Sequence, residues 1–307
     1  MCHVKVKVLP VAQGGIQGRE MKKSRKKRRF PLMEEMTVKT VREYLEKKNS
    51  IILPVGIIEQ HGYHLPLATD ELIAREISWM VAEETGVMVA PSLHTSFSGG
   101  GLPGTINISP SVMALVVRDV LTSLVLQGFK KIYIVLGHGG SQNLGALDNG
   151  LKVLLHDNPA FSDVMLALLP VWGFDSTGRG WSRALKEKDW HAGWIETSMV
   201  MAIAPELVDM EEMELDKKPP PGRKAEDPDN HQQAEKIVDD PAVVPRMSQR
   251  PDIKVGVLGR PAEASPALGR EIVGDTVKCM SEKIKELEKK YDGKYKRVFF
   301  KPPPPAL

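Results

Sequence analysis

Residues 111–137 read SVMALVVRDVLTSLVLQGFKKIYIVLG and place a mostly apolar helix directly before an apolar strand. Apolar residues recur at helical spacing through residues 111–129, with Ser109 or Ser111 as the predicted N-cap and Gly128 as the predicted stop. The β-branched run that follows, KKIYIVLG, predicts a buried strand. A helix joined to a strand by so short a connection indicates one repeat unit of an α/β fold.

The same alternation extends in both directions along the chain. On the N-terminal side, SIILPVG at residues 50–56 predicts a buried strand, and the helix predicted next, residues 70–84, begins at Thr69 or Asp70 as N-cap. The further expected elements are a strand at 87–91, a helix at 141–156, a strand at 164–170 and a helix at 267–290. Strands that alternate with helices at this spacing predict a mainly parallel sheet covered on both faces.

The composition is that of an ordinary globular protein, with 307 residues, 42% of them hydrophobic and 26% charged. The two cysteines, Cys2 and Cys279, cannot form a disulfide framework and lack the spacing of a zinc site, which favours a reducing compartment. No run of 18 apolar residues occurs, which argues against a membrane span, and the first residues lack the apolar stretch of a secretion signal. We therefore expect a cytoplasmic protein.

The positive charge is concentrated near the N-terminus, where KKSRKKRR at residues 22–29 leaves the rest of the chain mildly acidic. Such a run repels itself and predicts an exposed basic arm, residues 1–34. A single domain follows at residues 35–295, with an exposed Pro- and charge-rich excursion at about 210–250 and a tail at 296–307. Basic residues can neutralise phosphates, but no aromatic residues are interleaved for base stacking, which argues against a nucleic-acid partner.

Histidines and carboxylates follow the predicted strands, at the sheet edge where open α/β folds bind ligands. GIIEQHGYHLPLATD at 56–70 follows the first strand, GHGG at 137–140 the third, and WHAGWIETS at 190–198 lies beyond the fourth. Carboxylates and neutral imidazoles that converge on one point are the ligand set of zinc, manganese or iron. The candidate residues in these segments are Glu59, His61, His64, Asp70, His138, His191 and Glu196.

The spacing of these residues suits a metal site. Glu59 and His61 are two apart in an extended segment, so that their side chains point the same way, and Asp70 can bridge two ions with its two oxygens. Two ions about 3.5–4 Å apart activate a water and polarise a carbonyl. The alternative is a polar core network or a set of helix caps, which is the commoner role for any one such residue. Their recurrence at three strand ends favours the metal site.

The segment LPVGIIEQHGYHLPLATD at residues 53–70 resembles the signature of the creatininase (creatinine amidohydrolase) family. Further motifs follow in the family's order, namely GGGLPGT at 99–105, GHGG at 137–140, HAGWIETS at 191–198 and VGVLGRPAEASPALG at 255–269. The resemblance covers roughly residues 35–290. It implies a three-layer α/β/α fold with a mainly parallel sheet, a dinuclear metal centre and a homo-oligomer, a hexamer built from dimers.

The resemblance also implies roles for individual residues. Glu59, Asp70 and His138 would hold one metal, and His61 and Asp70 the second, with Asp70 bridging the two. His191 matches the family's catalytic histidine, which would pass a proton to the leaving group.

The sequence departs from the creatinine-cleaving members at the GHGG motif and beyond it. Those members have a further glutamate ligand at the position of Gly140, so we expect Glu196 to supply the missing carboxylate. Ser141 replaces an asparagine of the usual family motif and Trp194 stands where many members have a glutamate, which alters the pocket. The predicted substrate-binding residues are Gly139, Gly140, Ser141 and Trp194.

Four of the five tryptophans lie close together around the last motif, namely Trp172, Trp181, Trp190 and Trp194. They indicate either the packing of a loop or subunit interface, or an apolar lid over a small ring-shaped substrate.

The sequence therefore predicts a hydrolase that uses two divalent ions (zinc, manganese or iron) to open a small cyclic substrate, with creatinine itself not expected. A cyclitol-derived cyclic diketone of the 3-dehydro-scyllo-inosose type, as in inositol catabolism, is the favoured substrate. One alternative is an amidohydrolase acting on cyclic amides or formamides. The other is a non-catalytic protein that binds a metal or a ligand.

Overall fold

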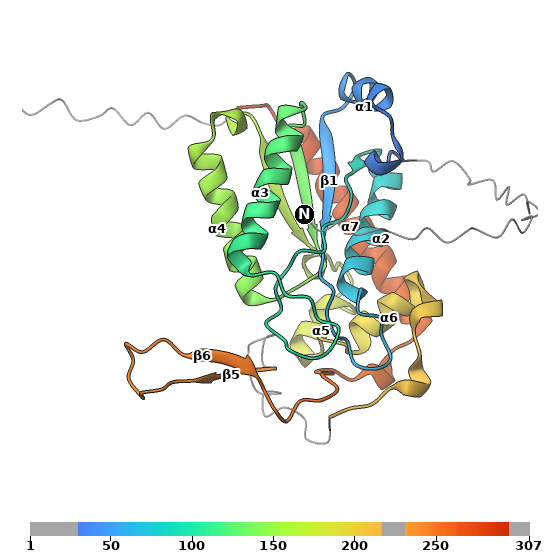
Figure 1. The fold of residues 1–307 in the computed structure, drawn as a ribbon. Coiled ribbons are helices and arrows are strands. Elements are labelled where there is room, and N and C mark those ends of the chain that lie inside the picture. Colours follow the sequence, from blue (N-terminus) through green and yellow to red (C-terminus); the bar gives the residue numbers. More distant parts are fainter. Residues whose placement is uncertain (1–29, 217–230, 295–307) are drawn as a thin grey trace, which may run out of the picture.

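A four-stranded parallel sheet forms the centre of the molecule, in the strand order β2-β1-β3-β4 (Figure 1). The strands are β1 (Ser50–Val55), β2 (Met88–Val89), β3 (Lys131–Leu136) and β4 (Met165–Pro170). The computed structural model describes residues 30–216 and 231–294, so the basic run at 22–29, the tail at 296–307 and part of the excursion lie outside the described residues. The predicted parallel sheet is confirmed.

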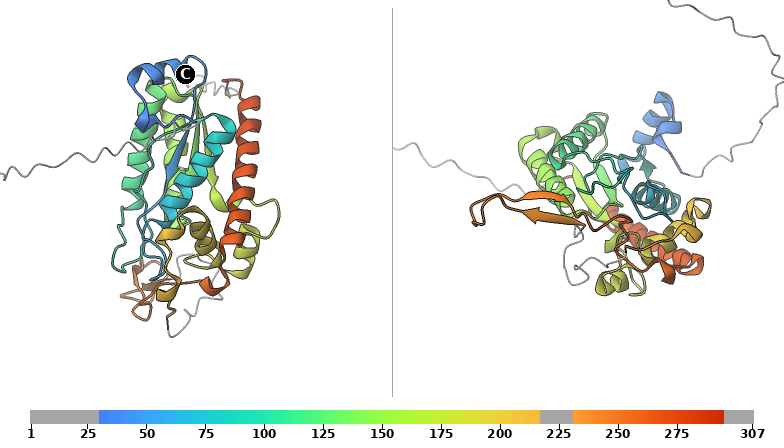
Figure 2. Two further views of the ribbon diagram at one scale, coloured as in Figure 1. Left: turned by 90° about the vertical axis from the view of Figure 1, so that its right-hand side faces the viewer. Right: turned by 60° about the horizontal axis from the view of Figure 1, so that its bottom comes forward.

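Helices cover both faces of the sheet, because the strand residues alternate between two apolar faces. Ile51 and Leu53 pack with α3 (Pro110–Leu126) and α4 (Ser141–Asp157) on one face. Ile52 packs on the other face, which is covered by the helices α2 (Thr69–Thr85), α6 (Trp194–Ile203) and α7 (Pro266–Lys290). Figure 2 shows the two helical layers on either side of the sheet, as the three-layer prediction requires.

Smaller elements complete the described chain. They are α1 (Val38–Leu45), α5 (Trp181–Glu187) and an antiparallel hairpin of β5 (Gln232–Glu235) and β6 (Arg246–Gln249). Short 3₁₀ helices lie at Met33–Glu35, Pro159–Phe161, Val171–Gly173, Pro205–Leu207, Met210–Glu212 and Pro261–Glu263. The hairpin projects from the body within the predicted excursion (Figure 1). Among the described residues, no helix is both long and apolar enough to cross a membrane.

Several predicted boundaries differ from the structure. The strand expected at 87–91 is reduced to the two residues of β2. The N-cap of α2 is Ala68 rather than Thr69 or Asp70, and Asp70 turns its carboxylate to His138 instead. The predicted arm ends too late, because Leu32 is buried and forms a bridge with Val89.

Two glycines bring the start of α2 against the sheet. A Cβ at Gly56, just after β1, would lie 2.6 Å from the Cα of Glu71, and one at Gly137, just after β3, would lie 2.0 Å from the carbonyl oxygen of Asp70. No other residue type fits at such a distance. The carboxyl ends of the two central strands therefore hold the first turn of α2, and with it Asp70, in contact with the edge of the sheet.

Candidate metal centre

Five buried side chains from four segments converge at the carboxyl edge of the sheet. Glu59 and His61 come from the loop after β1, Asp70 from the first turn of α2, His138 from the loop after β3 and Glu196 from the first turn of α6. Their potential ligand atoms form two groups that share Asp70. One group holds Glu59, Asp70 and His138, the other His61, Asp70 and Glu196, and within each the atoms lie within 4.8 Å of one another. The structure thus brings together all five predicted metal ligands.

The two oxygens of Asp70 face different histidines. Oδ2 lies 2.9 Å from Nδ1 of His138, and Oδ1 lies 3.4 Å from Nε2 of His61. A further carboxylate reaches each histidine, since Glu59 Oε2 lies 3.3 Å from His138 Nδ1 and Glu196 Oε2 lies 3.5 Å from His61 Nε2. This arrangement is that of a carboxylate bridging two neighbouring cation sites.

The hydrogen bonds on the outer side of each ring fix which nitrogen faces inward. His61 donates from Nδ1 to the carbonyl oxygen of Glu59 at 3.0 Å, and His138 donates from Nε2 to the carbonyl oxygen of Phe97, also at 3.0 Å. The other nitrogen of each ring then faces carboxylate oxygens, as in metal sites where an outer hydrogen bond orients the ligand histidine.

Two buried atoms of the cluster, Glu59 Oε2 and His61 Nε2, have no hydrogen-bond partner. Acceptors that face one another away from water need a second proton on the imidazole or a cation between them. Three carboxylates and two imidazoles are also the nitrogen and oxygen donor set of divalent zinc, manganese and iron. The residues present therefore fit a pair of divalent ions.

Burial and mutual charge shift the pKa values of the whole cluster. Burial alone would lower the pKa of both imidazoles, but the carboxylates, Asp70 foremost, raise it to about 10 for His61 and about 9 for His138. Burial raises the pKa of Glu59, and it raises that of Glu196 to about 8. Burial alone would also raise the pKa of Asp70, but the two histidines outweigh burial and lower this pKa. Without metal, the cluster binds protons at positions where cations would otherwise lie.

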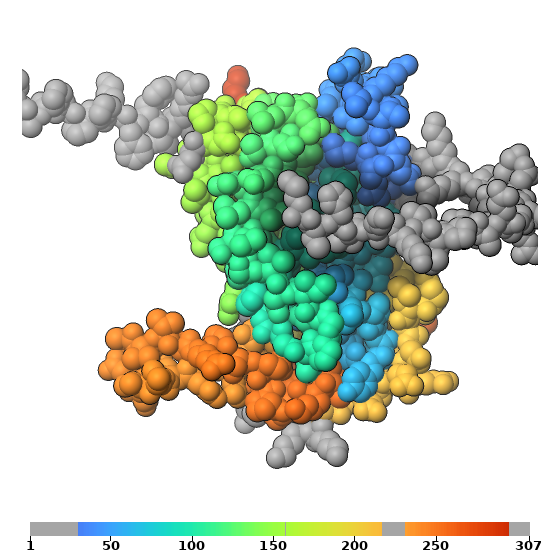
Figure 3. Space-filling model, viewed as in Figure 1, coloured from blue at the N-terminus to red at the C-terminus, as the bar shows by residue number. Residues whose placement is uncertain are grey.

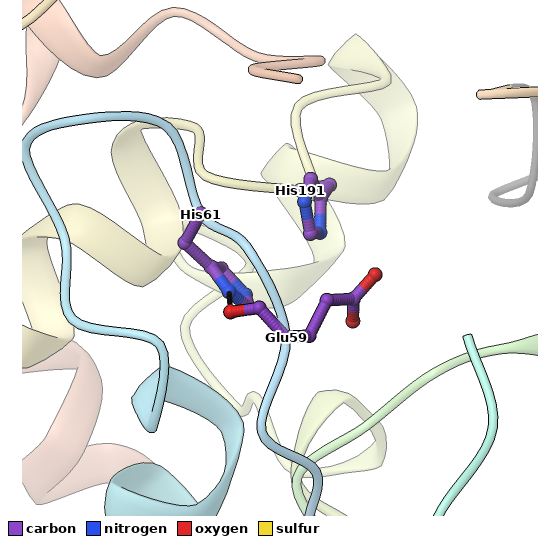
Figure 4. Close-up of side chains that lie close together, drawn as sticks. All are labelled: Glu59, His61 and His191. Carbon is purple, nitrogen blue, oxygen red and sulfur yellow. Dashed lines mark hydrogen bonds between the residues drawn. The ribbon is translucent and has the colours of Figure 1, made fainter. Parts of the chain in front are cut away.

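His191 lies beside the two groups, and Figure 4 shows its ring close to the side chains of Glu59 and His61. Its ring centroid is 4.4 Å from that of His61. The amide Nε2 of Gln60, which also donates to the Gly256 carbonyl, donates to Nε2 of His191 at 2.8 Å. The proton of a neutral His191 is then on Nδ1. Burial and the neighbouring His61 hold the pKa of His191 well below its usual range, so this neutral form is favoured.

The residue after His191 has a strained backbone. Ala192 is fully buried and has a φ of 52°, in the left-handed region that costs energy for any residue with a Cβ. This conformation directs its N–H at Glu196 Oε2, 2.7 Å away. The backbone at Ala192 therefore places the His191 ring beside the cluster and orients the Glu196 carboxylate.

A cavity of about 230 Å³ opens over the cluster. Besides cluster residues, its lining comprises Gly137, Gly139, Gly140, Trp172, Trp181, Leu185, Trp190, His191 and His231. Three of the four clustered tryptophans thus form an apolar wall, in agreement with the lid interpretation. No lysine or arginine contributes to the lining within the described ranges 30–216 and 231–294.

The predicted substrate-binding residues fall in different places. Gly139 and Gly140 line the cavity, whereas Ser141 is an exposed first residue of α4 outside the lining. The prediction for Trp194 is wrong, because its side chain is fully buried in the core, with the Arg183 guanidinium 4.5 Å above the ring. As the first residue of α6, it points inward between the helices.

Two residues of the site were not found from the sequence. Gln60 stands between the predicted ligands Glu59 and His61, and only the contact with His191 reveals its role. His231 belongs to the stretch predicted to be exposed, yet it is 5% exposed and lines the cavity. No strand end or periodic pattern marks it. His64, another candidate from the sequence, pairs its Nε2 with the Thr197 hydroxyl at 3.0 Å, beside Glu196 on α6.

Comparison with known proteins agrees with this geometry. The sequence model of the creatininase family, described as creatinine amidohydrolase, matches residues 34–284. The creatinine amidohydrolase of Pseudomonas putida is 29% identical over 175 residues, which are 52% of this chain and 66% of that protein. A mycofactocin precursor peptide peptidase of Mycolicibacterium smegmatis is 29% identical over 255 residues, 79% of this chain and 87% of that protein.

Another relative matches a shorter stretch. The 3-dehydro-scyllo-inosose hydrolase of Thermotoga maritima is 30% identical over 109 residues, 34% of this chain and 35% of that protein. Among solved structures, a manganese creatininase has a TM-score of 0.64 at 22% identity and covers 84% of this chain and 98% of its own. A mutant creatininase of the Zn-Zn type has a TM-score of 0.64 at 25% identity and covers 83% of this chain and 97% of its own.

Proposed function

Because the chain belongs to the creatininase family and is a metal-dependent hydrolase, we propose that it opens a small, neutral, ring-shaped substrate at a centre of two divalent ions. The observation that carries this proposal is the position of Asp70, which turns one oxygen to each of two separate groups of buried ligands. A helix cap or a polar core network would not leave the inward-facing Glu59 Oε2 and His61 Nε2 without partners.

The ions are zinc, manganese or iron. Glu59, Asp70 and His138 hold one of them, and His61, Asp70 and Glu196 hold the other. Two bound divalent ions activate a water and polarise the carbonyl of the substrate. The similarity to a manganese creatininase and to a mutant creatininase of the Zn-Zn type supports this choice of metals.

Glu196 takes the role of the glutamate that creatinine-cleaving relatives have at the position of Gly140. A Cβ at Gly140 would lie 2.6 Å from His138 Nε2, so this backbone leaves no room for a side chain there. Glu196 comes from the first turn of α6, and its Oε2 lies 3.5 Å from His61 Nε2. It therefore supplies the carboxylate of the second group.

His191 is the acid that protonates the leaving group. Gln60 donates to its Nε2, so the transferable proton is on Nδ1. One nitrogen of the ring lies within 4.8 Å of ligand atoms of Glu59 and His61, which brings it to the reacting centre. The neutral ring can give up its Nδ1 proton only as it takes up another at Nε2, in place of the hydrogen bond from Gln60.

The cavity wall favours a neutral ring over a charged chain. Trp172, Trp181 and Trp190 offer flat apolar surfaces, and the described lining has no lysine or arginine for a peptide carboxylate or a phosphate. The favoured substrate is a cyclitol-derived cyclic diketone, which the similarity to the Thermotoga maritima hydrolase supports. A cyclic amide or formamide is the second candidate, supported by the similarity to the Pseudomonas putida amidohydrolase.

The protein acts in the cytoplasm as a homo-oligomer, a hexamer. Light scattering on the purified protein tests this oligomeric state.

A substrate panel tests the proposal. Protein loaded with manganese or zinc is assayed on 3-dehydro-scyllo-inosose, cyclic amides including creatinine, formamides and a short peptide with a free carboxyl terminus. We expect turnover of a neutral ring, highest for the cyclic diketone, and its loss in His191→Ala. Fastest turnover of the peptide would contradict the ring-opening proposal, and creatinine turnover at comparable rates would contradict the argument from Gly140.

A further inference from the structure

The cavity contains a second imidazole to which the proposed function assigns no role. His231 is 5% exposed, and its Nε2 is buried without a hydrogen-bond partner. Its ring lies nearly parallel to that of His191, with the centroids 6.4 Å apart and the planes inclined by 27°. Much of the remaining wall is tryptophan and leucine, so these two rings are polar positions in an apolar surrounding.

The backbone of His231 is fixed by the hairpin that follows it. Its carbonyl oxygen accepts from the backbone N–H of Arg250 at 3.0 Å and from the side-chain amide of Gln249 at 3.2 Å. These bonds secure the main chain of His231 and leave the Nε2 of its ring unpaired. The hairpin therefore supplies an imidazole to the cavity without occupying this nitrogen.

The base of the hairpin is bound in turn to the glycine-rich loop at residues 98–101. Gln232 Nε2 donates to the Ser98 carbonyl at 3.1 Å, and the Gly101 N–H donates to Gln249 Oε1 at 2.9 Å. Gly99 has a φ of 79°, in the left-handed region that favours glycine, and a Cβ there would lie 2.2 Å from Gln232 Nε2, so a larger residue would disturb this contact. Figure 3 shows the base of the hairpin against this part of the body. The loop is a docking surface for the hairpin.

We propose that His231 is a substrate-binding residue whose Nε2 forms a hydrogen bond with a hydroxyl or carbonyl oxygen on the part of the ring remote from the metal centre. This inference rests on the proposed function. A buried polar atom without a partner is unfavourable, and a ligand oxygen is the partner that the cavity can admit. The substrate is then a ring that carries oxygen substituents on both sides, as a polyhydroxylated carbocycle does, rather than a ring that is polar only at the cleaved bond.

Two substitutions at the position separate hydrogen bonding from packing. His231→Leu keeps much of the volume and removes the polar atom, whereas His231→Gln keeps a hydrogen-bonding group near the position of Nε2. Gln233→Leu is the matched control on the same hairpin, because the Gln233 amide bonds to Glu235 within the hairpin, at 2.9 Å. Each variant is loaded with zinc or manganese and compared with the wild type in metal content, in kcat and KM for the best panel substrate, and in ligand titrations followed by the fluorescence of the cavity tryptophans.

We expect KM and the ligand dissociation constant of His231→Leu to rise about tenfold, as for one lost neutral hydrogen bond, with the metal content unchanged. His231→Gln and Gln233→Leu should stay within about threefold of the wild type. An active His231→Leu variant with unaltered KM would overturn the inference and leave the proposed function intact. Should His231→Leu not fold, His231→Phe, which keeps an aromatic ring and removes the polar atom, takes its place: a weakened His231→Phe beside a near-normal His231→Gln supports the inference, and an unweakened His231→Phe opposes it. A wild type that neither binds nor converts any panel compound would defeat both proposals.

Discussion

Asp70 shows how a single residue is positioned for its role by its neighbours. The first turn of α2 packs against Gly56 and Gly137, at the ends of β1 and β3, where only glycine fits. The Asp70 carboxylate is therefore held at the edge of the sheet. The side chain is 2% exposed and faces a histidine with each oxygen. An isolated buried carboxylate is costly, and this one is retained because opposite charge surrounds it, supplied by protonated imidazoles or by metal ions.

Gly140 provides a test at the scale of one methyl group. We expect Gly140→Ala to lower the metal content and to reduce turnover by about 10- to 100-fold, because its Cβ would lie 2.6 Å from the Nε2 by which His138 is oriented. Gly145→Ala on the same helix is the control, since a Cβ there meets nothing within 4 Å. Elemental analysis and activity assays compare the two variants, and full metal content and activity in Gly140→Ala would show that His138 is not a ligand.

The sequence was sufficient to find the five clustered side chains but not the whole cavity wall. Glu59, His61 and His138 follow strands of a parallel sheet directly, and such strand ends meet at one edge whatever the loops do. Trp194 and His231 lie far beyond the last strand, and their positions depend on how α6 and the hairpin pack. No local pattern encodes that packing, so one was wrongly assigned to the cavity and the other to the surface.

Helices α6 and α7 pack closely near the site. A Cβ at Gly269 of α7 would lie 1.7 Å from the carbonyl oxygen of Ser198 on α6. We expect Gly269→Ala to destabilise the protein by about 1–3 kcal/mol through overpacking, and to reduce activity because α6 carries Glu196. Gly274→Ala, at an exposed site on α7 with open space around it, should be neutral or stabilising by up to about 1 kcal/mol. Urea unfolding would refute this packing account if the two variants were equally stable.

The opposite end of α7 is held by Glu288 at the base of the sheet. Its carboxylate accepts hydrogen bonds from the Ser50 hydroxyl, from Lys131 at 2.7 Å and from the Tyr133 hydroxyl at 2.8 Å. Burial alone would raise the pKa of Glu288, but these donors outweigh it and lower the pKa below its usual value of 4.5.

A lowered carboxyl pKa predicts a specific dependence of stability on pH. The unfolded state takes up the proton first, so this stabilisation is complete above about pH 4.5 and is lost as the pH falls through the lower folded-state pKa. Glu288→Gln should lose stability less steeply than the wild type below about pH 4.5, whereas Glu282→Gln, exposed on the same helix, should follow the wild type. Urea unfolding between neutral pH and pH 3.5 measures this, and parallel curves for all three proteins would disprove the role of Glu288.

The elements themselves were largely predictable. Strands β1, β3 and β4 and the long helices α2, α3, α4 and α7 appear within a few residues of their predicted positions, because apolar periodicity and glycine stops mark them. β2 is shorter than predicted, since pairing at the sheet edge and not composition decides where a strand ends. The hairpin of β5 and β6 was missed, because its exposed polar residues carry no alternating pattern.

At the scale of the whole molecule, metal binding should contribute to stability. Five ionisable groups are buried together, and two divalent ions would satisfy them only in the folded state. Removing the metal with a chelator should lower the thermal unfolding midpoint by about 5–10 °C relative to protein with metal at 100 times its dissociation constant, where the linkage is about 2.7 kcal/mol for each ion. Added manganese or zinc should restore the midpoint. A midpoint that neither the chelator nor the added metal changes would argue against ions bound at the five side chains.

The most direct test of the central claim is the metal-to-chain ratio, measured by elemental mass spectrometry on protein purified without chelators and on three ligand variants. We predict a ratio near two for the wild type, near one for Glu59→Gln and for Glu196→Gln, which each belong to one ligand group, and near zero for Asp70→Asn, which belongs to both. A wild-type ratio near zero that manganese or zinc cannot restore, or an Asp70→Asn variant that still binds two ions, would contradict the bridged metal centre.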